Sequence, residues 1–180
     1  LEYTGDSGSC KKGVDVYRNW ISTKIFAASY TSTGGTTTAQ PILNKPVLVA
    51  SPTSPGYIVV FGTGSYIVNG DRTDTDIQSI YGIWDRLGTD LVSKSSLVQQ
   101  SYTNTCEIVV EDGVSTTTCG RSLSSNSVDL YESTDSEVTP SVLGWFNDLN
   151  VDSIDGVAAA PGERAIRNFQ IRGGIGFVNS

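Results

Sequence analysis

The sequence contains no histidine and no methionine among its 180 residues. Without histidine, the chain lacks the commonest zinc ligand and the commonest general base. It also has no apolar run near the roughly 20 residues that a membrane-spanning helix needs, so no membrane span is expected. Basic residues are few: 12 Lys and Arg against 19 Asp and Glu give a net charge of −7. Such a surface repels phosphate backbones, which makes nucleic acid a poor candidate partner.

Two short glycine motifs resemble catalytic or cofactor motifs but lack what those need. The GDSGS stretch at residues 5–9 resembles a serine-protease nucleophile motif, whose serine needs a base, ordinarily histidine. Gly62-Thr63-Gly64 lacks the third glycine and the following helix of a dinucleotide fingerprint. We predict a glycine-rich turn for the first motif and a tight turn between two strands for the second. No pair of carboxylates stands out for glycoside hydrolysis either, so no enzyme activity is expected.

What the chain has in plenty is serine, threonine, glycine and tyrosine, whereas alanine and leucine are scarce. Short β-branched and aromatic runs, separated by turn residues, predict an all-β protein. The predicted strands are Lys24 to Tyr30, Pro46 to Ala50, Tyr57 to Phe61, Ser65 to Val68, Ser79 to Trp84, Leu97 to Tyr102, the 106–119 hairpin, Val128 to Tyr131, Val142 to Leu149, Ala165 to Phe169 and Ile171 to Val178. Residues 77–87 also have apolar spacing that fits a helix, but their β-branched and aromatic neighbours favour a strand. Residues 31–38 and 71–76 are polar and are predicted loops.

The three cysteines carry more information than their number suggests. Asp112-Gly113 is a preferred pair for a two-residue hairpin turn, and counting outward from it places Cys106 directly opposite Cys119. In that register the two cysteines form a non-hydrogen-bonded pair with Cα atoms about 4.5 Å apart, which a disulfide can bridge. A structural disulfide predicts a location outside the cytosol. Cys10 remains, either paired with a segment outside this chain, paired with another molecule, or free.

The acidic stretch DLNVDSIDG places oxygen-bearing side chains at Asp148, Asn150, Asp152 and Asp155. This spacing resembles an abbreviated EF-hand loop, so calcium is a candidate ligand. The loop lacks the glycine at its sixth position, where Ser153 stands, and the glutamate at its twelfth, so a polar surface turn is the alternative. A second acidic cluster, Asp71, Asp74 and Asp76, gives a weaker version of the same signal.

An ordered set of motifs from residue 25 to residue 180 resembles the C-terminal β-propeller of type IV pilus biogenesis proteins. It begins with a proline-led strand and a strand that ends in FGTG, and it continues through a Gln-Ser pair to YGIWD. The matching residues are Pro46, Phe61 to Gly64, Tyr66, Asp71, Gln78-Ser79, Tyr81 to Asp85, Leu97 to Gln100, Gly144 to Leu149, Gly162 to Arg164 and Arg172 to Gly174.

The resemblance implies a non-enzymatic pilus biogenesis and adhesion factor, at the pilus tip or on the outer membrane. Minor pilins or a host or abiotic surface are then the expected partners, and calcium binding by an Asp/Asn-rich loop is a property of the family. The main alternative is a secreted carbohydrate- or surface-binding β module. A propeller enzyme is a remote third possibility because no catalytic constellation is present.

The length of 180 residues suits one domain spanning residues 1–180. A propeller blade takes about 40–50 residues, so the predicted strands amount to about three blades, in antiparallel meander sheets. The chain also begins at Leu1 without an initiator methionine or a signal peptide, as a segment of a longer protein would. We therefore expect a partial propeller, whose open strand edges can pair with another chain. We further predict that Phe61, Tyr81, Trp84 and Trp145 pack in the core.

Overall fold

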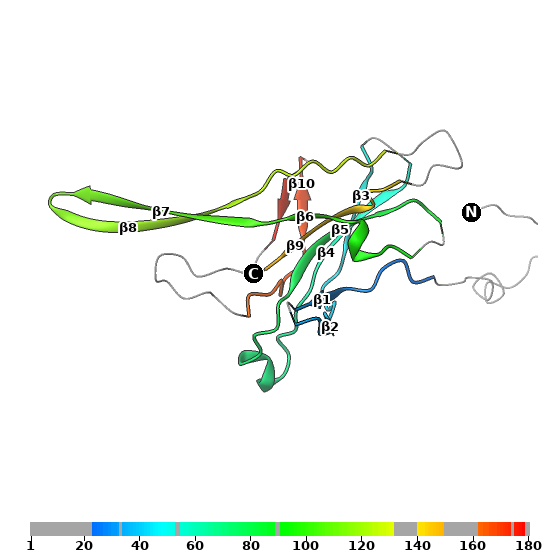
Figure 1. Ribbon diagram of the computed structural model, residues 1–180, viewed down its shortest axis with the longest axis horizontal. Helices are drawn as coiled ribbons and strands as arrows, with labels where there is room; N and C mark the ends of the chain where they lie inside the picture. The colour runs from blue at the N-terminus through cyan, green and yellow to red at the C-terminus, as the bar shows by residue number, and fades with distance from the viewer. Residues whose placement is uncertain are drawn as a thin grey trace, which may run out of the picture.

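The computed structural model describes residues 23–32, 34–52, 55–88, 91–131, 140–149, 162–173 and 175–178. All regular elements in these ranges are strands, apart from two short 3-10 turns (Figure 1). The strands are β1 (Ser29–Thr31), β2 (Thr37–Ala39), β3 (Val47–Ala50), β4 (Tyr57–Gly62), β5 (Ser79–Asp85), β6 (Val98–Gln100), β7 (Tyr102–Glu111), β8 (Val114–Leu123), β9 (Gly144–Asp148), β10 (Gln170–Arg172) and β11 (Ile175–Phe177). The 3-10 turns are η2 (Asn69–Arg72) and η3 (Lys94–Ser96). The predicted all-β class is confirmed, and no helix in the described ranges is long and apolar enough to cross a membrane.

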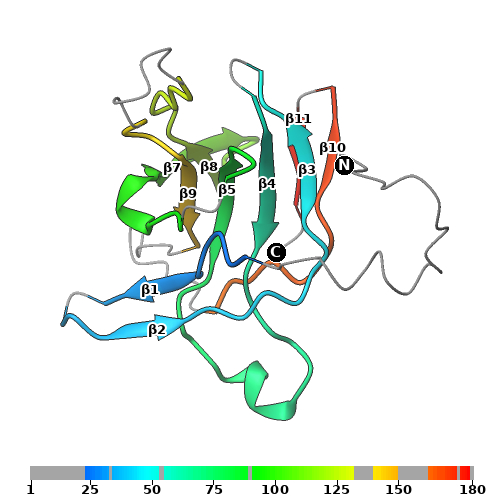
Figure 2. The ribbon, with the colours of Figure 1, turned by 90° about the vertical axis from the view of Figure 1, so that its right-hand side faces the viewer.

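One five-stranded sheet forms the body, in the order β3-β4-β5-β9-β6. Figure 2 shows β3, β4, β5 and β9 side by side in this sheet. Its first four strands pair antiparallel, as expected, but β6 pairs parallel to β9. A parallel pair needs a long crossover, and the stretch from Ser101 to Leu143, which contains the β7–β8 hairpin, supplies it. The other strands of the described ranges pair in twos, as β1–β2, β7–β8 and β10–β11. The strand count predicted about three blades. In the described ranges, however, the strands form one five-stranded sheet and three two-stranded ones, and not three sheets of similar size.

Strand β5 lies at the centre of the sheet, and the prediction of a strand rather than a helix at residues 77–87 is confirmed for its main part. Every residue from Ser79 to Trp84 is buried. A strand covered on both faces shows no alternation of apolar and polar residues, which explains why its pattern also fitted a helix.

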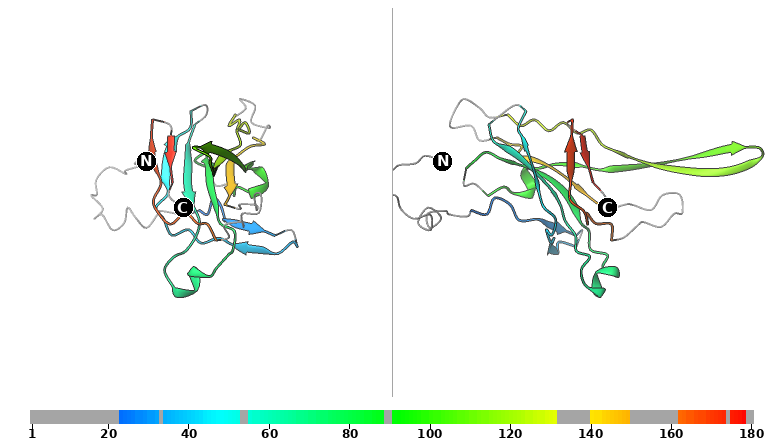
Figure 3. Two further views of the ribbon diagram at one scale, coloured as in Figure 1. Left: turned by 90° about the vertical axis from the view of Figure 1, so that its left-hand side faces the viewer. Right: turned by 180° about the vertical axis from the view of Figure 1, so that it is seen from behind.

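The β7–β8 hairpin is a two-stranded ribbon that extends away from the body (Figures 1 and 3). Asp112 and Gly113 both have positive φ angles, of 50° and 77°, as a type I′ turn requires. The predicted register is confirmed, and Cys106 lies opposite Cys119. The disulfide bond between the two cysteines stays a prediction.

Three predicted strands are wrong, and one predicted loop is only partly right. Residues 65–68, 128–131 and 165–169 have no strand structure, whereas the predicted loop at residues 31–38 includes the end of β1, at Thr31, and the start of β2, at Thr37 and Thr38. After Gly64 the chain turns outward instead of forming a strand, because the Asp71 carboxylate accepts hydrogen bonds from the backbone N–H groups of Ile67 and Val68. Those backbone groups are therefore unavailable for a β-ladder.

The core lies on both faces of the sheet as two clusters of buried side chains. On one face Phe61, Tyr81, Ile83 and Phe146 pack against the segments around Ala28 and Val92. On the other, Val60 and Ile80 pack against Ala165 and Phe169. Three of the four predicted core aromatics are buried: Phe61, Tyr81 and Trp84. The fourth, Trp145, is partly buried and packs against the cluster on the second face.

We expect Trp84→Ala to lower the free energy of unfolding by about 3–5 kcal/mol. Trp84 is 1% exposed and its indole Nε1 donates to the Pro55 carbonyl at 2.9 Å, so truncation leaves both a cavity and an unpaired acceptor. Tyr66→Ala, which removes a 59% exposed ring, is the matched control and should change stability by less than about 0.5 kcal/mol. Urea denaturation measures both. Equal losses from the two variants would contradict the assignment of Trp84 to the core.

Candidate functional site

The Gln-Ser and YGIWD motifs form a chain of buried hydrogen bonds on the first face of the sheet. The Tyr81 hydroxyl donates to Gln40 Oε1 at 2.6 Å, and Gln40 Nε2 donates to Ser79 Oγ at 2.8 Å. Ser79 Oγ in turn donates to Asp148 Oδ1 at 2.5 Å. Burial raises the pKa of Tyr81, so its hydroxyl keeps its proton and stays a donor. The chain of bonds ties β5 to β9 and to the residue after β2.

An ion pair ends this chain. Lys94 Nζ lies 3.0 Å from Asp148 Oδ1 and donates to the Ser29 carbonyl at 2.9 Å. The same ammonium lies 4.4 Å from the ring centroid of Phe146 and 5.5 Å from that of Tyr81, within cation–π range. Both partners of the pair are partly shielded, with side chains 23% and 14% exposed. The surroundings of Lys94 explain why η3 packs onto this face of the sheet.

The structure therefore gives the Asp148 carboxylate partners within the protein. One of its oxygens, Oδ1, is shared by Ser79 and Lys94. The other three predicted ligands, Asn150, Asp152 and Asp155, lie outside the described residues. No group of three or more potential metal ligands occurs within the described ranges. A calcium site on this loop stays a prediction from the sequence.

The second acidic cluster has structural roles in what is described of it. Asp71 Oδ2 accepts from Ser65 Oγ at 2.8 Å, in addition to the two backbone N–H groups, and these donors, with Ile67 first, hold the pKa of the Asp71 carboxyl below its usual value. Asp74 Oδ1 accepts from the backbone N–H of Asp76 at 2.8 Å. Hydrogen bonds of this kind shape a protruding loop.

The FGTG and GER motifs meet where β4 ends. Gly64 has a φ of 130°, and a Cβ placed there would lie 2.5 Å from Arg164 Cβ, so only glycine fits. Arg164 is 7% exposed, and its guanidinium donates to the carbonyl of Ser65 at 2.7 Å. Its Nε donates to the carbonyl of Gly162 at 2.9 Å. The predicted turn at Gly62–Gly64 is thus a packing site for the 162–169 segment and does not join two strands.

The second face of the sheet carries an apolar cavity of about 360 Å³. It lies between the sheet, the β10–β11 hairpin and the base of the β7–β8 ribbon. Its lining residues are Val49, Ile58, Val60, Ile80, Tyr102, Leu123, Trp145, Asn147, Phe169, Ile171, Gly176 and Val178. A cavity of several hundred cubic ångströms with a few polar groups has the size and chemistry of a ligand or side-chain binding site.

Trp145 explains how the cavity is shaped. A Cβ at Gly82 would lie 2.3 Å from Trp145 Nε1, so the glycine of YGIWD makes room for this ring to lie on β5. The polar groups at the cavity are Tyr102 and Asn147. Asn147 is 2% exposed, and its Oδ1 has no hydrogen-bond partner in the described part of the chain. Burial, followed by the nearby Glu163 carboxylate, raises the pKa of Tyr102.

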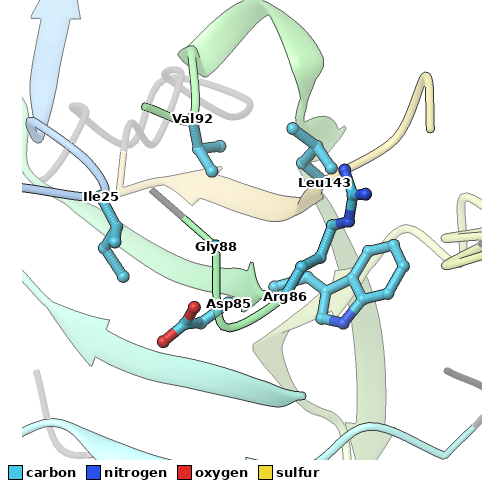
Figure 4. Close-up of a pocket in the computed structure, with 7 residues that line it drawn as sticks. Ile25, Asp85, Arg86, Gly88, Val92 and Leu143 are labelled. Carbon is cyan, nitrogen blue, oxygen red and sulfur yellow. The ribbon is translucent and has the colours of Figure 1, made fainter. Parts of the chain in front are cut away.

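A second cavity, at the other end of β5, is too small for a substrate. Figure 4 shows it lined by Ile25, Val92 and Leu143 beside Asp85 and Arg86. Its volume is about 30 Å³. A space of that size holds about one or two water molecules.

A five-stranded sheet with a core cluster on each face and a protruding two-stranded ribbon defines an all-β domain. Comparison with known proteins gives the family: residues 11–118 match the PilY1 beta-propeller domain. This match covers more than half of the chain, which therefore belongs to the PilY1 beta-propeller family. The partial propeller inferred from the sequence is confirmed by this match and by the likeness to a solved structure.

Curated relatives and that solved structure place the similarity in context. The type IV pilus biogenesis factor PilY1 of Pseudomonas aeruginosa strain PAO1 is 49% identical over 59 residues, which cover 32% of this chain and 5% of the relative. The PilY1 homolog of Xylella fastidiosa is 34% identical over 61 residues, covering 34% of this chain and 4% of the relative. The crystal structure of the P. aeruginosa PilY1 C-terminal domain aligns with a TM-score of 0.55 and 29% identity, covering 79% of this chain and 29% of that chain. The chain thus spans a small part of these relatives.

We expect Asp148→Ala to lower the free energy of unfolding by about 1–3 kcal/mol, because it leaves Lys94 and Ser79 without their shared acceptor. Lys94→Ala should also destabilise, and the double variant should lose less than the sum of the two. Asp76→Ala is the matched control, since its exposed side chain should contribute less than about 0.5 kcal/mol. Urea denaturation gives all four values. Strict additivity would show that the ion pair does not couple the two residues.

Proposed function

We propose that this chain is part of a type IV pilus biogenesis factor and acts by binding rather than by catalysis. The observation that carries this proposal is that residues of the motifs that resemble the pilus biogenesis family have defined structural roles here. Gly64 fits against Arg164, Gly82 against Trp145, and Gln78-Ser79 is buried where β5 begins. A role at the pilus tip or the outer cell surface, contacts with minor pilins, and adhesion are parts of the same proposal.

A domain-exchange experiment tests the proposed function. The segment of P. aeruginosa PilY1 that aligns with this chain is replaced by residues 23–178, and surface pili are quantified from sheared cell fractions. We expect the chimera to restore pili to a strain that lacks PilY1, and the same chimera with Trp84→Ala to restore fewer. A chimera that accumulates at normal levels in the cell envelope but yields no surface pili would contradict the proposal.

Carbohydrate binding is a second candidate, and one observation favours it. Trp145 and Tyr102 both line the apolar cavity, and aromatic rings are the usual platform for sugar rings. The remaining lining, however, is mostly aliphatic, and the cavity is better matched to an apolar group than to a hydroxyl-rich one. Screening the protein on a glycan array, with Trp145→Ala as the comparison, separates the two functions.

We also propose that Cys106 and Cys119 are bonded, which supports a location outside the cytosol. Peptide mapping without reductant should recover their two peptides joined. Replacing both cysteines by serine should lower stability by about 2–3 kcal/mol, because the disulfide closes a short loop. Recovery of either cysteine joined to Cys10 would contradict the pairing.

A further inference from the structure

Among the described strands, those of the β7–β8 ribbon have the longest open edges. In the part of the chain that the structure describes, β7 pairs with β8, and neither has a second neighbour. Each strand is ten residues long, and the ribbon runs clear of the body in two opposite views (Figures 1 and 3). A row of unpaired backbone N–H and C=O groups on such an edge is a template for another strand.

The five-stranded sheet, unlike the ribbon, has protected edges. At the β6 edge, Gln100 Nε2 donates to the Asn126 carbonyl at 2.8 Å, and Asn126 Nδ2 donates to the Gln99 carbonyl at 2.8 Å. The opposite edge strand, β3, has four residues and begins directly after Pro46. Short strands, prolines and covering loops are the devices that natural sheets use against unwanted pairing.

The outer edge of β7 carries a chemical pattern, and that of β8 does not. Ile108 and Val110, which are 71% and 63% exposed, project from one face of β7. Glu107 and Glu111 are exposed on its other face, with Val109 between them. By contrast, the β8 residues that face this part of β7 are Val114, Ser115, Thr116, Thr117 and Thr118. A strand pairing with β7 therefore meets apolar side chains on one face and two carboxylates on the other.

The hydrogen-bond pattern of the ribbon leaves backbone groups of β7 pointing outward, where such a strand can pair with them. Glu111 and Val114 flank the two-residue turn and exchange hydrogen bonds, and the pairs alternate from there. Val110 and Ile108 consequently lie in non-hydrogen-bonded pairs and direct their N–H and C=O groups away from β8. On the other edge, Ser115 and Thr117 direct their groups outward in the same way.

We propose that the outer edge of β7 binds an extended strand of a partner protein whose side chains alternate between apolar and basic. Charge complementarity selects this partner, because basic residues would lie opposite Glu107 and Glu111 while apolar residues extend the patch of Ile108 and Val110. A second copy of this chain is disfavoured, since pairing β7 with itself in register brings glutamates opposite one another. The proposal does not depend on the pilus role.

The test uses the 180-residue chain and a fluorescein-labelled peptide of alternating lysine and valine. We expect saturable binding by fluorescence anisotropy, with at least tenfold weaker binding of an alternating glutamate–valine peptide. A peptide of the same lysine and valine content in two blocks should also bind at least tenfold more weakly. Equal affinity for the alternating and block peptides would overturn the proposal, because it would reflect net charge alone.

Two proline variants distinguish the edges. Ile108 and Thr117 face each other across the ribbon, so Ile108→Pro and Thr117→Pro each remove one outward N–H, from β7 and from β8 respectively. Only Ile108→Pro should abolish binding, while melting temperature verifies that both variants fold. Hydrogen exchange on the unmodified chain gives an independent readout, with peptide-induced protection at Ile108 and Val110 and none at Thr117. Equal effects on the two edges would overturn the proposal.

A charge exchange tests the recognition itself. Glu107→Lys with Glu111→Lys should switch the preference to the glutamate–valine peptide. Asp76→Lys with Asp129→Lys makes the same change in net charge at exposed sites off the ribbon and should leave the preference for the lysine–valine peptide unchanged. A switch in both double variants would overturn the proposal. Sedimentation of the chain with and without the peptide is a further check, and dissociation of a dimer of this chain by the peptide would also overturn the proposal.

Discussion

The fold depends on strand β5 being buried on both faces at once. Its residues from Ser79 to Trp84 are all buried, so each must fit a neighbour on its own side. Gly82 fits because it has no side chain where Trp145 lies, and Ser79 fits because its hydroxyl joins Gln40 to Asp148. A buried polar group without a partner would destabilise the sheet. The Lys94 ammonium, which comes from the separate turn η3, therefore contributes to the same constraint by pairing with Asp148.

Local sequence was sufficient to predict the features whose determinants are local. Asp112-Gly113 fixes the turn, and the register of the whole hairpin follows from counting outward, including the facing positions of Cys106 and Cys119. The β5 strand was predictable from its β-branched and aromatic content. The resemblance to the pilus biogenesis family was also readable, because its motifs appear in order along one chain.

Other features depend on contacts between distant residues, and sequence alone could not reveal them. Ser65 to Val68 has the composition of a strand, yet the Asp71 carboxylate captures its backbone N–H groups. Asp148 is predicted as a calcium ligand from local spacing alone, and nothing in its neighbourhood shows that Lys94, 54 residues away, lies beside it. Trp145 packs against the core as its sequence context predicted, but its position in the lining of a cavity depends on residues far away in the sequence.

The two faces of the sheet consequently differ in how fully their polar groups are paired and their apolar groups packed. On the first face, each polar side chain in the hydrogen-bond chain from Tyr81 to Lys94 has a partner, and aromatic rings pack around this chain. On the second, a cavity remains beside Trp145, and the buried Asn147 Oδ1 has no partner within the described ranges. Neighbouring blades of a propeller pack face to face, so an apolar cavity on the second face is compatible with a further blade packing there. The cavity thus marks the face on which further contacts of this module are to be sought, whereas the ribbon edge provides a separate, backbone-based surface.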